Sequence, residues 1–351
     1  MKIRTLIVDD SAVIRTLYSR MLSSDPEIEI VGVACDPFEA RELLVRLRPD
    51  VMTLDIEMPR MDGLTFLEKV MEYLPVRTLI ISSFSGAGAS QLLRAFELGA
   101  VDVISKPTLQ GQSTFEQVSH ELISRVKAVA HANLPNPTVH YLKSKNSLNK
   151  YEAIHLKQNH KIIAIGASTG GTEALKVVLS ALPENIPGTV IVQHMPPVFT
   201  KTYAATLQRL CPFEVKEAED GDCVQEGRVI LAPGNFHMTL VKSGNKFHVA
   251  LDQNPPLHGV RPSVDILFQS VAKVAGPQSI GMLLTGMGSD GARGLLEMKK
   301  AGSFNIAQDE LTSVVFGMPK EAIALKAVHA ILPLDKIADA VLIRILKRIA
   351  S

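Results

Sequence analysis

Short apolar runs of strand length alternate with amphipathic segments along nearly the whole of this 351-residue chain. The alternation occurs twice, first over about residues 2–133 and again from residue 161 onward. Continuous apolar runs indicate parallel strands covered on both faces, and the segments between them indicate helical crossovers. We therefore expect an α/β chain with two doubly wound parallel-sheet domains, one in each half.

The predicted elements follow from these two series. In the first series, strands are expected at 4–8, 27–34, 50–55, 77–83 and 101–105, and helices at 11–24, 37–48, 90–99 and 114–130. In the second series, strands are expected at 161–167, 188–194, 227–233, 247–252 and 279–286, and helices at 172–182, 263–275 and 290–302.

The segment between the two series is rich in Asn, Lys, Pro and Ser and has few large apolar residues. Such a segment cannot offset the entropy of ordering by burying apolar surface. We therefore predict a first domain at residues 1–131, a linker at 132–160 and a second domain at 161–351.

The charge balance excludes some classes of partner. Lys and Arg total 37 against 36 for Asp and Glu, so no overall charge favours binding to nucleic acid or to an anionic membrane. The N-terminus lacks the apolar stretch of a signal peptide, and no run reaches the length needed to span a membrane. Cys35, Cys211 and Cys223 are scattered, which does not favour a disulfide framework or a structural zinc site. We expect a reduced, cytoplasmic protein without membrane insertion.

Polar side chains gather where the strands of the first domain end. Asp9 and Asp10 end the first predicted strand, Asp55 ends the third, Ser82 the fourth, and Lys106 follows the fifth. Parallel strands bring these positions to one sheet edge, where α/β proteins bind ligands. Three adjacent carboxylates repel one another and favour a hard cation such as Mg²⁺. Each aspartate alone could instead cap a helix or a turn, but the combination favours a phosphoacceptor site.

The motifs VDDS, LDIEMPRMDG, ISS and KP resemble the receiver domain of two-component response regulators over about residues 1–130. This resemblance implies a flavodoxin-like fold and transfer of a phosphoryl group from a histidine kinase to Asp55. It also implies that Mg²⁺ is held by Asp9, Asp10, Asp55 and the backbone carbonyl of Glu57. Ser82 and Lys106 would respond to phosphorylation as switch residues. Many receivers carry an aromatic switch residue where this chain has Val103.

In the second domain, the apolar run IIAIGASTGG at 162–171 leads into small residues that present one hydroxyl, that of Ser168. A strand-to-helix corner offers free N–H groups and a helix dipole, which suit a developing oxyanion. His194 ends the next predicted strand, and Asp290 follows in a glycine-rich segment, so the three types of a hydrolytic triad are present. The order Ser, His, Asp differs from that of α/β-hydrolases.

Each of these residues has another possible role. The loop GASTGG could cradle a dinucleotide pyrophosphate, although no acidic residue ends the second strand to hold a ribose. His194 could be a core or loop histidine, but adjacent strands would bring it to Ser168. Asp290 could be an N-cap of the helix at 290–302, and it could cap that helix and orient an imidazole together.

The motifs IGASTGGTEAL, VQHMPP, LAPGNFHM, RPSVDILF, LTGMGSDGARGL and VVFGMPKEAI resemble the catalytic domain of the chemotaxis protein-glutamate methylesterases. The resemblance covers residues 161 to about 345 and implies a Rossmann-like serine hydrolase domain that needs no cofactor. It implies that Ser168 is the nucleophile, His194 the general base and Asp290 the group that orients His194. It further implies that the backbone N–H of Met287 donates to the oxyanion and that Thr169 assists.

The resemblance implies a phosphorylation-activated enzyme that serves chemosensory adaptation. Its substrates would be glutamate methyl esters of chemoreceptors, with release of methanol, and receptor glutamines, which it would deamidate. An unphosphorylated receiver docked over the serine would exclude the receptor. The alternative is a response regulator whose second domain only binds a protein. A DNA-binding output is disfavoured because the chain lacks a basic helix-turn-helix motif.

Overall fold

The computed structural model describes residues 1–83, 89–106, 115–134 and 161–346. Contacts between residues divide the chain into two compact units, Met1–Pro135 and Asn136–Ser351. The predicted linker at 132–160 lies outside the described residues from residue 135 onward. Within the described part of the chain, no helix has the length and apolar character needed to cross a membrane.

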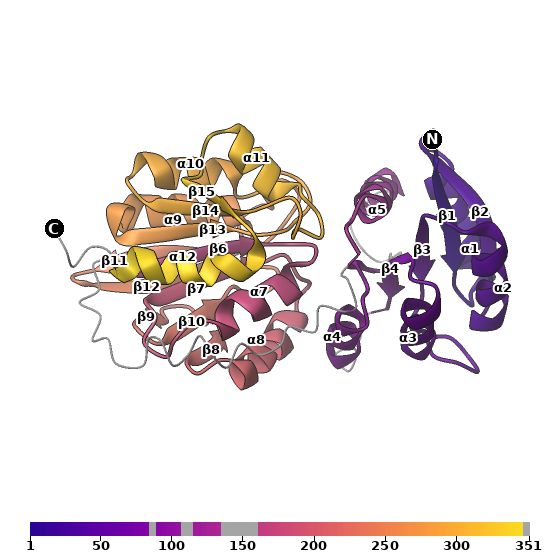
Figure 1. Ribbon diagram of the computed structural model, residues 1–351, viewed down its shortest axis with the longest axis horizontal. Helices are drawn as coiled ribbons and strands as arrows, with labels where there is room; N and C mark the ends of the chain where they lie inside the picture. Colours follow the sequence, from indigo (N-terminus) through magenta and orange to yellow (C-terminus); the bar gives the residue numbers. More distant parts are fainter. Residues whose placement is uncertain (84–88, 107–114, 135–160, 347–351) are drawn as a thin grey trace. The chain divides into compact units, whose positions relative to one another are not determined.

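The first unit is built on a parallel sheet with the strand order β2-β1-β3-β4-β5 (Figure 1). Its strands are β1 (Ile3–Val8), β2 (Ile28–Ala34), β3 (Val51–Leu54), β4 (Arg77–Ser82) and β5 (Asp102–Ser105). Its helices are α1 (Ala12–Leu22), α2 (Pro37–Leu47), α3 (Gly63–Tyr73), α4 (Ala89–Glu97) and α5 (Phe115–Ala130). The five predicted strands and the doubly wound, flavodoxin-like order are confirmed; α3 was not predicted.

Local sequence explains where the helices of this unit begin. Ser11 caps α1 by accepting the N–H of Ile14, and Asp36 caps α2 by accepting the N–H groups of Phe38 and Glu39. Side-chain oxygens at these positions satisfy amides that a helix start leaves free. The caps fix the short turns that follow β1 and β2 and so fix the sheet edge that carries the aspartates.

The second unit contains a parallel sheet with the order β15-β14-β13-β6-β7-β10-β8. Its strands are β6 (Ile162–Ala167), β7 (Gly188–Gln193), β8 (Glu214–Glu217), β10 (Arg228–Leu231), β13 (Ser279–Leu283), β14 (Phe304–Gln308) and β15 (Ala330–Leu332). Its helices are α7 (Gly171–Ser180), α8 (Phe199–Leu210), α9 (Val264–Val274), η2 (Gly276–Gln278), α10 (Ala292–Lys300), α11 (Met318–Ala324) and α12 (Leu334–Leu346). α7 packs against α12 and α9 packs against α10, so the doubly wound prediction is confirmed (Figure 1).

One predicted strand lies outside the parallel sheet. The run at 247–252 belongs to β12 (Lys246–Asp252), which pairs antiparallel with β11 (His237–Ser243) and β9 (Cys223–Val224). Its alternating burial, with Phe247 and Val249 buried, fits a strand that is covered on one face only. The chain turns tightly at Gly244, which places β11 beside β12 as its antiparallel partner. The run at 247–252 does not by itself indicate this pairing.

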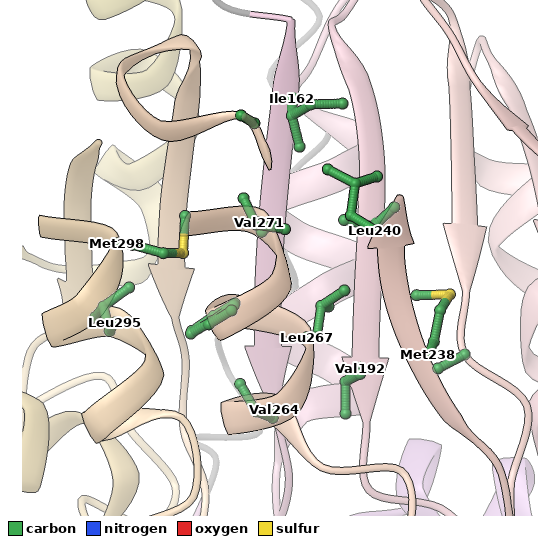
Figure 2. Close-up of a cluster of buried hydrophobic side chains, with 14 of the residues drawn as sticks. Ile162, Val192, Met238, Leu240, Val264, Leu267, Val271, Leu295 and Met298 are labelled. Carbon is green, nitrogen blue, oxygen red and sulfur yellow. The ribbon is translucent and has the colours of Figure 1, made fainter. Parts of the chain in front are cut away.

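Helix α9 fills the space between the parallel sheet and this antiparallel sheet. Figure 2 shows Val264, Leu267 and Val271 of α9 among side chains of β6, β7 and β11, with α10 alongside. The three α9 side chains are fully buried. Burial of such aliphatic side chains contributes roughly 1.5–3 kcal/mol each, so α9 is held rigidly in place. Its N-terminus therefore provides a fixed support at the carboxyl edge of the parallel sheet.

Candidate functional site

The aspartates of the first unit meet as predicted. Asp9 follows β1 and Asp55 follows β3, and the carboxylate oxygens of Asp9, Asp10 and Asp55 lie within 4.8 Å of one another. Asp9 and Asp55 are buried, whereas Asp10 is exposed. Each of the two buried carboxylates accepts a local backbone amide, from Ser11 and Glu57 respectively. The cluster is therefore open to solvent on one side.

Lys106 is the cation that faces this cluster. Its Nζ lies 2.6 Å from Oδ2 of Asp55 and 2.9 Å from Oδ2 of Asp9. Burial raises the pKa of Asp55, and the hydrogen bond from Lys106 opposes this shift without cancelling it. Burial lowers the pKa of Lys106, but its hydrogen bonds to Asp55 and Asp9 outweigh burial and leave that pKa above its usual value. One lysine does not neutralise three carboxylates, so the donor set fits a hard divalent cation.

Ser82 and Val103 lie in β4 and β5, the two strands that follow β3 in the sheet. Ser82 is the last residue of β4 and is buried, and its backbone carbonyl accepts the backbone N–H of Lys106 at 2.9 Å. Val103 is buried in β5. The backbone of Ser82 is thus bonded to the backbone of Lys106 where β4 and β5 end. Residues 84–88 and 107–114 lie outside the described part of the chain.

In the second unit, Ser168 and His194 follow adjacent parallel strands. Ser168 lies between β6 and α7, and His194 follows β7, which pairs with β6 in register. The N–H of His194 donates to the carbonyl of Ala167, which directly precedes the serine. No hydrogen bond joins the Ser168 hydroxyl to the imidazole among the described residues. Such bonds are often longer without substrate.

A glycine brings the loop with Met287 against the serine. A Cβ on Gly286 would lie 2.7 Å from Cβ of Ser168 and 2.3 Å from Sδ of Met318, so only glycine fits there. The N–H of Ser168 donates to the carbonyl of Thr285, and the hydroxyl of Thr285 donates to the carbonyl of Thr169. The loop that follows β13 therefore lies directly beside the serine corner.

Asp290 is the hydrogen-bond partner of His194. Nε2 of His194 lies 2.8 Å from Oδ2 of Asp290, and both side chains are largely buried. Burial raises the pKa of Asp290, but the hydrogen bond and charge of His194 and the amides of Asp265 and Val264 outweigh it and lower that pKa. Because an ionised carboxylate only accepts, Nε2 is the donor, and in the neutral imidazole Nδ1 keeps a lone pair. Nδ1 is then the nitrogen that can accept a proton.

The expected cap by Asp290 is found on a different helix. Gly291 is the N-cap of α10 and forms no side-chain cap, so Asp290 does not cap the helix that it precedes. It caps α9 instead. Its carboxylate accepts from Oγ of Ser263 and from the N–H groups of Val264 and Asp265, at 2.7 to 3.0 Å. Sequence reasoning missed Ser263 and Asp265, for which the start of RPSVDILF was the only signal.

We expect Asp290→Asn to destabilise the second unit. The carboxylate accepts four hydrogen bonds, two on each oxygen, whereas an amide turns one of these atoms into a donor that faces two other donors. The loss should be about 3 kcal/mol, or a fall in melting temperature of roughly 6 to 12 °C, measured by thermal unfolding. Asp252→Asn is the control and should melt as the wild type does, because among the described residues this carboxylate accepts only the N–H of Asn254.

We also expect the loss of stability in Asp290→Asn to depend on pH. Because the pKa of Asp290 is lowered in the folded state, its contribution to stability is complete above the unfolded value of about 3.9 and is lost as the pH falls through the folded pKa. The difference in stability between wild type and Asp290→Asn should therefore shrink below about pH 4. A difference that stayed constant between pH 7 and pH 3 would contradict this account of the carboxylate.

Val198 occupies a strained position four residues after His194. Its φ of 76° and ψ of −34° are rare for a β-branched residue, and its side chain is exposed. We expect Val198→Gly to raise stability by about 1 kcal/mol, because relief of strain exceeds the extra entropy of glycine. Val241→Gly, at an exposed position in the extended strand β11, should instead lower stability by roughly 0.5–1 kcal/mol. Chemical denaturation of both variants tests the difference in sign.

The folds and the two sites define a class: a two-domain response regulator whose output domain has the constellation of a serine hydrolase. The family described as CheB methylesterase matches residues 163–341, and the response regulator receiver domain matches residues 5–114. This chain belongs to the CheB methylesterase family.

Relatives and a solved structure agree with this membership. A protein-glutamate methylesterase/protein-glutamine glutaminase of Bdellovibrio bacteriovorus is 52% identical over 100% of this chain and 99% of its own length. One of Pseudomonas aeruginosa is 48% identical over 97% of each chain. The crystal structure of the Thermotoga maritima CheB methylesterase catalytic domain is 42% identical and covers 52% of this chain and 97% of its own, with a TM-score of 0.51.

Proposed function

We propose that this protein is a phosphorylation-activated protein-glutamate methylesterase and protein-glutamine glutaminase that acts on chemoreceptors. The observation that carries the proposal is a His194 imidazole bonded to the buried carboxylate of Asp290, whose pKa is lowered, at the end of a strand that pairs with the strand leading to Ser168. Full-length relatives at about half identity carry the same two activities in their names.

Ester cleavage would proceed through an acyl-enzyme. Ser168 Oγ attacks the carbonyl carbon of the glutamate methyl ester while its proton passes to Nδ1 of His194. The backbone N–H of Met287 donates to the resulting oxyanion, and Thr169 assists beside the nucleophile. The bond to the methoxy oxygen breaks, and His194 returns the proton so that methanol leaves. Water then attacks the acyl group by the same route and frees the glutamate; a glutamine side chain would release ammonia instead.

Asp290 would hold His194 in the productive tautomer. Its carboxylate fixes the proton on Nε2 and stabilises the positive charge that the imidazole acquires. Because the cap on α9 immobilises that carboxylate, the imidazole needs no reorganisation during the reaction.

The receiver would supply regulation through Asp55. A chemotaxis histidine kinase would donate the phosphoryl group to Asp55, and Ser82 and Lys106 would respond to the new charge. Mg²⁺ would be held by Asp9, Asp10, Asp55 and the backbone carbonyl of Glu57, where it would offset the negative charge of the transferred group. Ester hydrolysis would need no cofactor. Methanol release from methylated receptor membranes, measured with and without acetyl phosphate, tests the esterase activity and its activation through the receiver together.

A further inference from the structure

A second imidazole–carboxylate pair lies beside the first. Nε2 of His258 donates to Oδ2 of Asp265 at 3.0 Å, and the Asp265 side chain is buried while about a third of the His258 side chain is exposed. The other oxygen of Asp265 accepts the backbone N–H of Gly294 at 2.6 Å. Burial of a carboxylate is unfavourable unless its oxygens are bonded. His258 therefore supplies a partner that Asp265 needs.

This pair is linked to Asp290 through two helix starts. Asp290 accepts the amides of the first turn of α9, and Asp265, in that turn, accepts an amide from the first turn of α10. Each carboxylate thus caps the helix next to the other. A Cβ on Gly294 would lie 2.8 Å from the carbonyl oxygen of Asp265, so the two helices touch through their backbones. Loss of the hydrogen bonds to Asp265 would leave the start of α10 without this restraint. Because Asp290 directly precedes that start, its carboxylate would be held less firmly.

The turn that carries His258 is built to present it. His258 and Gly259 have φ values of 54° and 77°, and Leu257 and Val260 exchange backbone hydrogen bonds across them. A histidine at positive φ is uncommon, so this conformation must be held by its surroundings. Nη1 of Arg261 fixes the same loop by donating to the carbonyls of Gln253 and Asn254.

We propose that Asp265 and His258 are positioning residues for the hydrolytic reaction: they hold Asp290, and through it His194, in place for proton transfer. The inference rests on the proposed function, because the reaction it concerns is ester hydrolysis at Ser168. Neither residue touches the reacting atoms. Their effect appears in the rate of the chemical step and not in the binding of the receptor.

The test compares two substitutions at one exposed residue. Gln places its amide nitrogen near the position of Nε2 and keeps a donor there, whereas Asn is too short to reach Asp265 but suits the positive φ. We expect His258→Asn to lower kcat about tenfold with KM unchanged, and His258→Gln to restore most of the rate. His248→Asn, at a histidine whose Nδ1 contacts the carbonyl of Gly221, is the matched control and should keep the wild-type kcat.

Asp265→Asn provides the stronger variant, with an expected loss of about 100-fold in kcat. If it fails to fold, His258→Asn carries the test by itself. The second readout is the NMR signal of the His194 Nε2 proton, which should shift or broaden in His258→Asn and remain in His258→Gln. A wild-type kcat in a folded His258→Asn, or an unchanged proton signal, would overturn the inference. Absence of Ser168-dependent methanol release from the wild type would overturn the proposed function, while the proton signal would still decide on the positioning role.

Discussion

Ser168→Ala should abolish release of methanol from methylated receptor membranes, with kcat reduced by about 10⁴-fold or more. A serine triad without its nucleophile keeps only the contribution of the oxyanion site and of substrate binding. The substitution keeps the Cβ that lies against Gly286, so the packing of the corner and the melting temperature should not change. Activity is measured as methanol released per enzyme from receptors labelled at the methyl group.

The matched control is Ser180→Ala. Ser180 is exposed at the end of α7 and donates to the carbonyl of Val177, so its loss should leave the rate unchanged. Methanol release by Ser168→Ala at the wild-type rate would rule out Ser168 as the nucleophile. Release by neither the wild type nor any variant would favour a second domain that only binds its partner.

Asp55→Asn should remove all stimulation of methanol release by acetyl phosphate while it leaves the basal rate in place. The amide cannot accept a phosphoryl group, and the serine site lies in the other unit of the chain. The variant should also melt at a higher temperature. Burial raises the pKa of Asp55, so at neutral pH the ionised carboxylate costs stability that the neutral amide does not.

Asp50→Asn is the control for this experiment, because Asp50 directly precedes β3 and Asp55 directly follows it. Asp50 accepts the backbone N–H of Arg4, which an amide oxygen can also accept, so stimulation should persist. Stimulation that survived in Asp55→Asn would place the phosphoacceptor elsewhere. A fall in melting temperature would show that the pair with Lys106 outweighs the burial of the charge.

The sites at the sheet edges could be predicted from the sequence because the end of a buried strand is visible as the end of an apolar run. Asp9, Asp55, Ser168 and His194 each follow an apolar run, and a parallel sheet brings such positions to one edge whatever the order of its strands. The chemistry of the cluster then follows from the residue types. The placement of these residues depends only on local patterns, which is why it could be predicted, and the chemistry stays a prediction.

What the sequence did not reveal depends on contacts between distant segments. Asp290 precedes α10 and has the local pattern of its N-cap, but its four partners come from His194 and from the start of α9, 25 residues or more before it in the chain. The antiparallel pairing of β11 with β12 and the positive φ of Val198 likewise depend on tertiary packing. Local propensity is overridden at such positions.

The double role of Asp290 has a consequence for how this protein could lose its activity over time. A chain that drifts toward a purely binding role can replace Ser168 without harm to its fold, but replacing Asp290 removes the cap of α9 as well. Inactive descendants should therefore keep the aspartate long after the serine has gone. A retained Asp290 would then indicate only that the start of α9 is intact. The presence of Ser168 would be what distinguishes an active enzyme from an inactive descendant.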